Sequence, residues 1–424
     1  MRLSSLGAHI SRLGPHLLLL AGLWHLSPAL AQEATAPNWL PFGECQVSAW
    51  TSNRNLDDRQ DFGSAGCQVS VKPKFTPELS LGLNFRAGWQ DNSGADSGSQ
   101  RWREAYLDWA QEAWSVRLGR QIISWGRADS LNPTDKFAPK DFTLLSPDDD
   151  AQRQGVDAAN LRWRVTPHVS VSLVAAQFTP HLTPQGTLPA NLVKPQEPGD
   201  TQWGLKLDRE GQGVDWSVSL YDGYERFVRY ALDLSNPKSP QFQGDFERAK
   251  SVGADFAFAT GAFTWRGEFS HALLQPGCTA CPSYERRVSR AVMGGDLDFA
   301  STMNLNVQLF VNRHWDYQAP AAVPGALQAL QTGRNLLNRE FADTETGVTM
   351  RLSDRLFNDK LKWEIAAVFD TTGGSRVIRP RLTYIFNDRF KLNVGMDFFE
   401  GDSQTYFGSF SKNRLAYAMI GLVF

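Results

Sequence analysis

Apolar and polar residues alternate with a period of two along most of this chain, and this pattern is the strongest constraint on its fold. From Met303 to Leu309 every second residue is apolar, and the three residues between them are asparagine or glutamine. Successive side chains of a β-strand point to opposite faces, so such a segment is a strand with one apolar and one polar face. Segments 79–89, 361–369 and 390–398 show the same split. The pattern predicts an all-β protein.

Eighteen two-faced segments can be placed on the sequence, or sixteen if a hairpin is miscounted. The expected strands are 43–53, 65–75, 78–90, 101–110, 113–124, 155–166, 168–179, 200–209, 213–223, 246–260, 262–273, 285–299, 302–315, 342–353, 358–370, 375–386, 389–400 and 412–424.

Short turns and long links alternate between these segments, which is the layout of a transmembrane antiparallel up-and-down β-barrel with its short turns in the periplasm. A soluble two-sheet sandwich is the rival fold, but eighteen strands are many for one sandwich and no linker divides them. After residue 31 no run of about 18 apolar residues occurs, so membrane helices are not expected. Aromatic residues on the apolar faces, such as Trp50, Trp109 and Trp163, are expected to form the interfacial girdles of a barrel.

The first 31 residues have the features of a secretory leader. Arg2 and Arg12 precede an apolar core from Leu17 to Leu26, and Ala29-Leu30-Ala31 provides small residues for cleavage. We therefore expect a signal peptide at 1–31, a short periplasmic segment at 32–42 and a barrel at 43–424. The protein would then reside in the outer membrane of a Gram-negative bacterium, in contact with its lipid.

Charge and cysteine content add two constraints. The formal net charge is −2, and removal of the two leader arginines makes it −4, which gives no indication of nucleic-acid binding. Cys278 and Cys281 lie in a turn-rich stretch of an exported protein and are expected to form a small loop disulfide rather than a metal or redox site. Cys45 and Cys67 share the tetrapeptide Cys-Gln-Val-Ser, and whether they pair is left open.

If apolar residues face lipid, the polar face lines the interior. A barrel of this size leaves a water-filled lumen, so the charges there can be hydrated. They either set a transverse field that selects solutes or form structural cross-strand pairs. Arg379 with Arg381 and Arg162 with Arg164 make the densest basic ladder. The pore-lining candidates are Arg86, Arg117, Arg162, Arg164, Arg266, Arg351, Arg379, Arg381, Asp255, Asp296, Glu364 and Asp397.

The link from Trp125 to Gln154 is long, punctuated by prolines and mixed in charge, as expected of a loop that folds into the lumen and narrows it. Its acidic run could hold a calcium ion, but a solvated turn is the simpler interpretation because the spaced glycine and glutamate of a dedicated loop are missing. The segment from Pro324 to Leu337 is expected to form a short helix over the mouth. The constriction-loop candidates are Asp129, Asp135, Lys136, Lys140, Asp148, Asp149 and Asp150.

One segment resembles a known recognition signal, and another resembles the signature of a known family. The last strand, ending at Phe424, resembles the C-terminal signal that the barrel-assembly machinery recognises, although Tyr417 lies one place off the usual aromatic position. Residues 119–129, with Asn132-Pro133-Thr134-Asp135, resemble a signature of porin-like proteobacterial barrels, including the alginate-export type and related groups of unknown function. The resemblance implies passive transport or export across the outer membrane.

The expected function is a porin-like channel that passes small polar or anionic solutes or exports a polymer such as a polysaccharide. The alternative is a structural barrel that serves as a scaffold for a periplasmic or envelope partner. We expect no enzymatic activity, catalytic residue, metal or cofactor, because the chain after the leader has few histidines and no Gly-x-Ser-x-Gly motif. The oligomeric state, monomer or trimer, is left open.

Overall fold

The computed structural model describes residues 39–52, 61–91, 97–183, 191–211, 213–236, 238–277, 284–299 and 302–424. Residues 41–424 form one compact unit. The predicted leader, and the predicted pair Cys278 and Cys281, lie outside the described residues.

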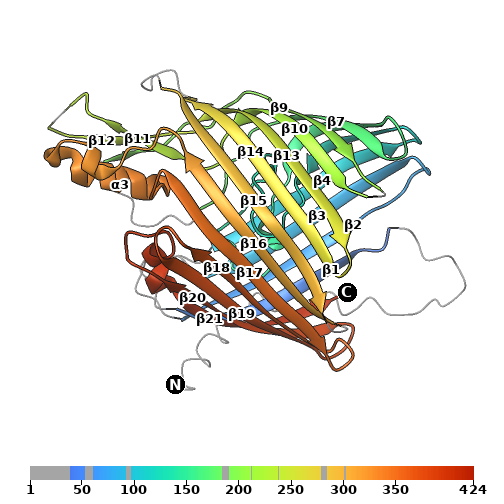
Figure 1. Ribbon diagram of the computed structural model, residues 1–424. Helices are drawn as coiled ribbons and strands as arrows, with labels where there is room; N and C mark the ends of the chain where they lie inside the picture. The colour runs from blue at the N-terminus through green and yellow to red at the C-terminus, as the bar shows by residue number, and fades with distance from the viewer. Residues whose placement is uncertain are drawn as a thin grey trace, which may run out of the picture. The chain divides into compact units, whose positions relative to one another are not determined.

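Eighteen antiparallel strands form a single sheet that closes on itself when β1 pairs with β21 (Figure 1). This confirms the predicted all-β up-and-down barrel and its strand number. The strands are β1 Phe42–Ser52, β2 Asp61–Val71, β3 Leu79–Gln90, β4 Ser97–Ala110, β5 Trp114–Gln121, β6 Val156–Arg164, β7 Val169–Ala176, β9 Gln202–Arg209, β10 Asp215–Tyr224, β13 Arg248–Thr260, β14 Phe263–Gln275, β15 Arg286–Phe299, β16 Met303–His314, β17 Thr344–Leu356, β18 Leu361–Asp370, β19 Ser375–Ile385, β20 Phe390–Glu400 and β21 Leu415–Val423.

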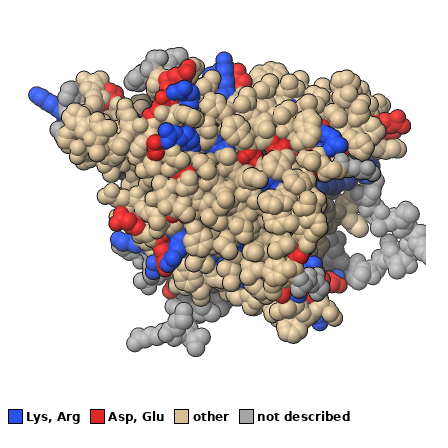
Figure 2. Space-filling view, viewed as in Figure 1, with Lys and Arg blue, Asp and Glu red and all other residues tan. Residues whose placement is uncertain are grey.

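The period-two pattern separates an apolar outer surface from a polar interior. On β16 the side chain of Leu309 is 60% exposed, whereas the neighbouring Gln308 is 1% exposed. Figure 2 shows the result on one face: a broad area without charge, with charged side chains gathered towards its edges. Such a belt requires lipid around it, because its exposed leucines, valines and phenylalanines would be poorly hydrated in water.

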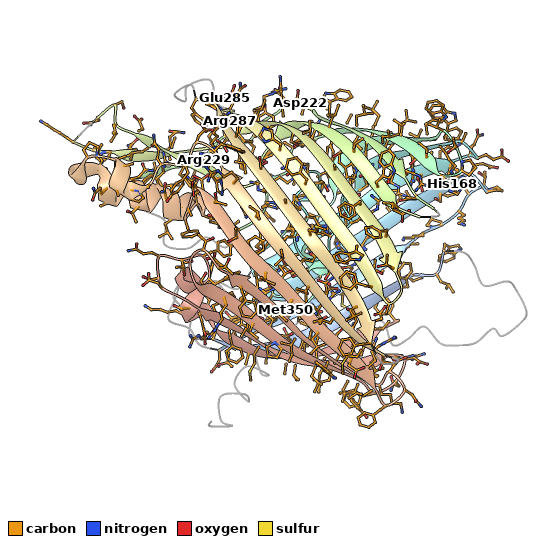
Figure 3. The ribbon with its side chains drawn as sticks, in the orientation of Figure 1. His168, Asp222, Arg229, Glu285, Arg287 and Met350 are labelled. Atoms are coloured by element: carbon orange, nitrogen blue, oxygen red, sulfur yellow. A yellow bond between two sulfur atoms is a disulfide. The ribbon has the colours of Figure 1, made fainter. Side chains whose placement is uncertain are left out.

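Short turns join the strands at one end of the barrel and long loops at the other. His168 lies in the short β6–β7 turn and Arg287 near the long-loop end, and Met350 lies midway along β17 on the outer wall (Figure 3). By the usual orientation of such barrels the long loops are extracellular. No helix in the described part of the chain is long and apolar enough to cross a bilayer.

A small sheet and a helix occupy the long-loop end. Strands β8 (Leu192–Val193), β11 (Arg229–Asp233) and β12 (Gln241–Asp245) form the sheet, and α3 (Gln328–Asn338) lies against β11 (Figure 1). The Asn338 side chain accepts a hydrogen bond from Tyr230 N–H and donates one to Tyr230 C=O. The helix expected at 324–337 is present, whereas this sheet was not expected from the sequence.

Two aromatic residues near the barrel seam point inward. Trp50, expected in the lipid girdle, is 5% exposed, and its indole N–H donates to the Ser48 hydroxyl at 2.7 Å. It packs on Tyr417 at a ring-centroid distance of 4.7 Å, which also explains the position of Tyr417 in the last strand. The prediction for Trp50 was wrong because an apolar residue of an interior loop, Leu145, packs against this cluster.

The open question about the N-terminal cysteines has an answer in the strand register. Cys45 of β1 lies directly opposite Cys67 of β2, and a disulfide joins them.

Candidate functional site

The connection between β5 and β6, residues 122–155, runs through the interior of the barrel; we call it the lumenal loop. Its atoms contact inward-facing side chains on β3, β4, β9, β13, β14, β17 and β19, strands that lie on all sides of the barrel. A segment can reach all of these strands only by crossing the lumen. The link therefore folds into the lumen, as expected from the sequence.

Glu268 of β14 fixes the first part of the lumenal loop. Its carboxylate accepts hydrogen bonds from the backbone N–H of Arg127 at 2.6 Å and of Ala128 at 2.5 Å. It also accepts from the side chains of Asn132 at 3.1 Å and Thr134 at 2.9 Å. The Glu268 residue is 4% exposed, and a carboxylate buried to this degree is stable only when such donors satisfy it.

Gly126 allows this close approach. Its φ is +96°, a conformation that favours glycine, and a Cβ at this position would overlap the Glu268 carboxylate. The glycine of the Trp-Gly-Arg run in the sequence is thus required by both backbone conformation and space.

Arg127 makes a second anchor in the lumen. Its guanidinium pairs with Asp208 of β9 at 2.6 Å and with Asp255 of β13. Arg266 of β14 donates to the Arg127 carbonyl at 3.0 Å and pairs with Asp296 at 3.0 Å. The predicted lumenal residues Asp255, Arg266 and Asp296 therefore form part of the frame that holds the loop.

Aromatic side chains of the loop pack against the wall between these polar anchors. Trp125 and Phe137 lie edge to face with a ring-centroid distance of 5.0 Å, and Phe137 contacts Tyr221 of β10 at 5.2 Å. Gly204 of β9 provides the space, because a Cβ there would lie 2.5 Å from Phe137 and 2.6 Å from Trp125. This apolar contact rigidifies the first part of the lumenal loop, residues 122–137, which we call its root.

Two further ion pairs hold the middle of the lumenal loop. Asp129 pairs with Arg351 of β17 at 2.9 Å, and burial raises the pKa of Asp129 although Arg351 opposes the change. Lys136 pairs with Glu225 at 3.0 Å. Burial alone would raise the pKa of Glu225, but Lys136 and Arg290 outweigh it, so the pKa is lowered and the carboxylate is ionised.

Two other constriction-loop candidates, Asp135 and Lys140, contact loop residues rather than the barrel wall. Asp135 pairs with Arg153 of the same loop at 2.6 Å. Burial raises the pKa of Asp135. The backbone N–H of Lys140 donates to His181 Nδ1 at 2.8 Å.

The acidic tip of the lumenal loop, residues 148–150, is exposed to solvent. The side chains of Asp149 and Asp150 are 72% and 81% exposed, although the loop lies inside the barrel. Arg379 of β19 approaches Asp149 at 4.0 Å, and Arg381 donates to the Pro147 carbonyl at 2.7 Å. Water must therefore occupy the lumen beside residues 148–150.

Arginines of β3 and β4 hold the opposite flank of the tip. Arg86 donates to the Ala151 carbonyl at 2.6 Å, Arg103 donates to the Arg153 carbonyl at 2.8 Å, and Arg101 pairs with Asp141 at 2.9 Å. Of these three arginines, only Arg86 is among the predicted pore-lining residues. The register between β3 and β4 shifts after Asn84, and this bulge brings Arg101 opposite Arg86, out of step with the alternation of the rest of β4.

All but one of the remaining predicted wall charges have a partner elsewhere in the barrel. Arg381 binds Glu364 at 2.6 Å, Arg379 lies 3.5 Å from Asp397, and Arg117 binds Asp108 at 3.0 Å. Arg162 donates to Ser170 at 3.1 Å and lies 3.6 Å from Glu210. Arg164 is exposed near the short-turn end and has no ion-pair partner among the described residues.

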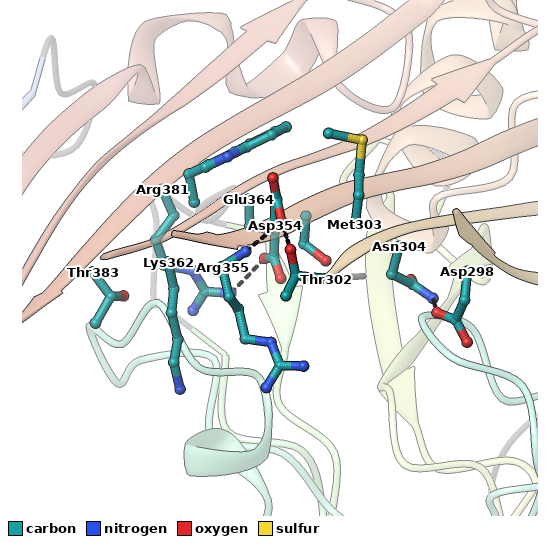
Figure 4. Close-up of a pocket in the computed structure, with 12 residues that line it drawn as sticks. Asp298, Thr302, Met303, Asn304, Asp354, Arg355, Lys362, Glu364, Arg381 and Thr383 are labelled. Atoms are coloured by element: carbon teal, nitrogen blue, oxygen red, sulfur yellow. Dashed lines mark hydrogen bonds and ion pairs between the residues drawn. The ribbon is translucent and has the colours of Figure 1, made fainter. Parts of the chain in front are cut away.

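A cavity of about 600 Å³ opens at the short-turn ends of β15 to β19 (Figure 4). Arg355, Lys362 and Arg381 line it together with Asp298, Asp354 and Glu364. Each of these carboxylates accepts a hydrogen bond from a neighbour: Asn304, Thr302 and Arg381 donate to Asp298, Asp354 and Glu364, respectively. The Lys362 side chain has no hydrogen-bond or ion-pair partner in the described part of the chain, so its ammonium is available to a solute.

Closed strands, an apolar outer belt and a polar lumen narrowed by an internal loop define the class: this is a porin-like outer-membrane β-barrel. No protein-family model matches the sequence. No curated protein matches it either.

Solved structures of outer-membrane proteins are similar to this chain in fold. OccAB1 of Acinetobacter baumannii has a TM-score of 0.59 over 94% of this chain and 99% of its own, at 10% identity. The outer-membrane protein OpdK of Pseudomonas aeruginosa has a TM-score of 0.51 over 91% and 99%, also at 10% identity. OccK5 (OpdH) of the same organism has a TM-score of 0.50 over 91% and 97%, again at 10% identity. These likenesses confirm the predicted fold class. The apolar outer belt of the barrel fits the predicted outer-membrane location.

Proposed function

We propose that this protein is an outer-membrane channel for small polar solutes, and that it favours anionic ones. The observation that carries the proposal is the contrast within the lumenal loop. Its root is buried and bonded to the wall, whereas the side chains of Asp149 and Asp150 are mostly exposed to water inside the barrel. A loop pinned across an 18-stranded barrel beside a hydrated gap is a constriction rather than a plug.

The preference for small solutes rests on the contacts that hold the tip of the loop. Arg381 and Arg86 hold the tip of the loop from β19 and β3, on opposite flanks, so the loop cannot swing aside without breaking charge-assisted hydrogen bonds. This arrangement favours small solutes over an extended polymer chain.

The preference for anions rests on the cavity near the short-turn ends. Its carboxylates are bonded to neighbouring side chains, whereas the Lys362 ammonium is unpaired within the described ranges. A carboxylate or phosphate on a passing solute would be the natural partner of this cation.

Planar-bilayer recording and liposome swelling test the proposal together. Reconstituted protein is expected to give discrete conductance steps, and liposomes are expected to swell faster in an anionic sugar than in neutral or cationic sugars of similar size. Lys362→Ala is expected to reduce the anionic advantage without changing the swelling rate in the neutral sugar, and Lys391→Ala, which removes a wall lysine paired with Glu44 at 2.7 Å, is the matched control. Absence of conductance steps at every voltage would refute the channel. Equal swelling rates for all three sugars would refute the preference for anions but not the channel itself.

A further inference from the structure

The disulfide between Cys45 and Cys67 lies on the outer face of the barrel. Three residues further along β1, Ser48 faces the lumen, where its hydroxyl oxygen lies 2.6 Å from that of Ser64 on β2. Trp50, which is also inward, is two positions from Ser48 and five from Cys45. Successive side chains of a strand point to opposite faces, so Cys45 points outward, as does Cys67 opposite it in the register.

Neighbouring strands cover both sides of this disulfide in the complete barrel. Cys45 pairs in the register with Leu422 of β21, the strand that closes the barrel against β1 (Figure 1), and Cys67 pairs with Ala87 of β3. Cys45 is 4% exposed although it lies on the outer face, and membrane lipid covers that face in the assembled protein. Access to the sulfur atoms is therefore lost once β3 and β21 are both in place.

Formation of the bond requires that access. One cysteine thiolate attacks a sulfur atom of the oxidant's disulfide and forms a mixed disulfide, which the second cysteine thiolate then resolves. The two thiols lose two protons and two electrons, and the oxidant leaves as a dithiol. A protein oxidant cannot bring its sulfur atoms against Cys45 through two neighbouring strands and lipid. The bond must therefore form before these strands enclose it.

The register of β1 on β2 is weakly specified by the other side chains. β2 contains Gly-Ser-Ala-Gly at 63–66, and both strands carry the tetrapeptide Cys-Gln-Val-Ser, at 45–48 and 67–70. Gly-rich strands are prone to register slips, and a slip of two residues keeps every side chain on its own face. Because β1 also pairs with β21, such a slip would misplace the closing strand as well. A bond between Cys45 and Cys67 permits only the native register.

We propose that Cys45 and Cys67 are oxidised on the β1–β2 hairpin before the barrel closes, and that the bond fixes the register of this hairpin. The oxidant that this chemistry requires is an exported protein with a reactive disulfide, because thiols of exported chains are oxidised outside the cytosol. This partner acts during assembly, and the step does not depend on what passes through the lumen.

The order of events can be tested on the full chain with Cys278→Ser and Cys281→Ser, which leave Cys45 and Cys67 as the only thiols. The reduced chain receives an oxidised thiol–disulfide oxidoreductase either before or after the detergent in which the barrel folds. A maleimide-linked polyethylene glycol then counts the free thiols on a gel. We expect both thiols to be lost in the unfolded chain, and the reaction to be about tenfold slower or more in the folded barrel. Equal rates would overturn the proposed order.

An exposed pair of positions provides the matched control. The hydroxyl oxygens of Thr346 and Thr371 lie 2.8 Å apart at the extracellular ends of β17 and β18. Thr346→Cys with Thr371→Cys, in a chain in which serine replaces all four native cysteines, should be oxidised after folding. Equally fast oxidation of the native pair in the folded barrel would contradict the proposal.

The reverse reaction tests the same point if the reduced chain does not fold. A dithiol protein reductant should open the native disulfide in the unfolded chain but not in the oxidised, folded barrel. Equal reduction in the two states would show that the sulfur atoms remain accessible, which the proposal excludes.

Folding yield tests the register role. Heat-modifiable mobility on a gel separates folded from unfolded barrels, and we expect reduction of the disulfide to lower the folded fraction. The chain with Cys45→Ser and Cys67→Ser is the control, because its folded fraction should match that of the reduced chain and should not respond to reductant. Equal folded fractions for the oxidised and the reduced chain would overturn the register role.

Discussion

The carboxylate of Glu268, in the wall of the barrel, lies 2.6 Å from the backbone nitrogen of Arg127, in a loop 141 residues earlier in the chain. This contact joins the lumenal loop to β14. Around it, the side chains of Asn132 and Thr134 donate to the same carboxylate. The position of the lumenal loop therefore depends strongly on one acidic side chain.

Glu268→Gln is expected to loosen the lumenal loop. The amide keeps the shape of the side chain, but its NH₂ group faces N–H donors and one acceptor oxygen is lost. We expect the free energy of unfolding to fall by about 1–3 kcal/mol, and single-channel recordings to show larger and noisier currents. Asp108→Asn, which alters a wall carboxylate whose partner Arg117 is also in the wall, is the control. Unchanged currents in Glu268→Gln would contradict this role.

Gly204→Ala is expected to displace the aromatic root of the loop. The added methyl group would lie 2.5 Å from Phe137 and 2.6 Å from Trp125, so both rings must shift. Overpacking of this kind costs about 1–3 kcal/mol, and we expect a lower unfolding temperature with altered tryptophan fluorescence. Gly98→Ala in β4, where a Cβ meets nothing within 4 Å, should leave both measurements unchanged. A Gly204→Ala protein as stable as the parent would show that the rings are not packed as described.

Acidification is expected to release the loop at Lys140. Burial, reinforced by Arg226 and Lys140, lowers the pKa of His181 from its ordinary value of 6.5 to about 3, so the folded protein holds the neutral ring that accepts from Lys140 N–H. A histidine with a lowered folded pKa stabilises the fold fully above pH 6.5, and the contribution is lost as the pH falls from 6.5 towards 3.

Channel noise recorded at pH 7 and pH 5 measures this effect, with His181→Gln as the comparison because its amide oxygen can still accept a hydrogen bond. The parent should become noisier at pH 5, and the variant should respond less to pH. The same response in both proteins would assign the pH dependence to other groups.

Arg379→Ala combined with Arg381→Ala is expected to widen the passage as well as change its charge. Arg381 holds both the Pro147 carbonyl and Glu364, and Arg379 lies beside Asp149 and Asp397. Loss of these contacts frees the loop tip, so liposomes should swell faster in all sugars, with the largest gain for the largest sugar. Equal rates for parent and variant in every sugar would exclude these arginines from the constriction.

The barrel could be predicted from sequence because alternation is a local signal. Each strand carries its own apolar and polar faces, as the pair Gln308 and Leu309 illustrates, so strand number and position need no knowledge of tertiary contacts. That the link between β5 and β6 is a folded loop was also predictable, because it is long and contains prolines and charges of both signs.

The partners of the loop could not be predicted in the same way. Nothing local indicates that Glu268 receives the backbone of residues 127 and 128, since the contact spans 141 positions. The bulge after Asn84 shifted Arg101 and Arg103 out of the expected alternation, and Trp50 turned inward because the loop offered it an apolar neighbour. These features follow from tertiary packing, which overrides the local pattern where the loop meets the wall.

The most direct test of the channel is whether a group at the tip of the lumenal loop lies in the current path. Asp149→Cys would be recorded in planar bilayers before and after a small cationic thiol reagent, with the parent protein as the control. The account predicts discrete conductance steps that change in size when the thiol is modified, and no change in the parent. A barrel that conducts no current, or a current that is indifferent to modification at residue 149, would contradict it.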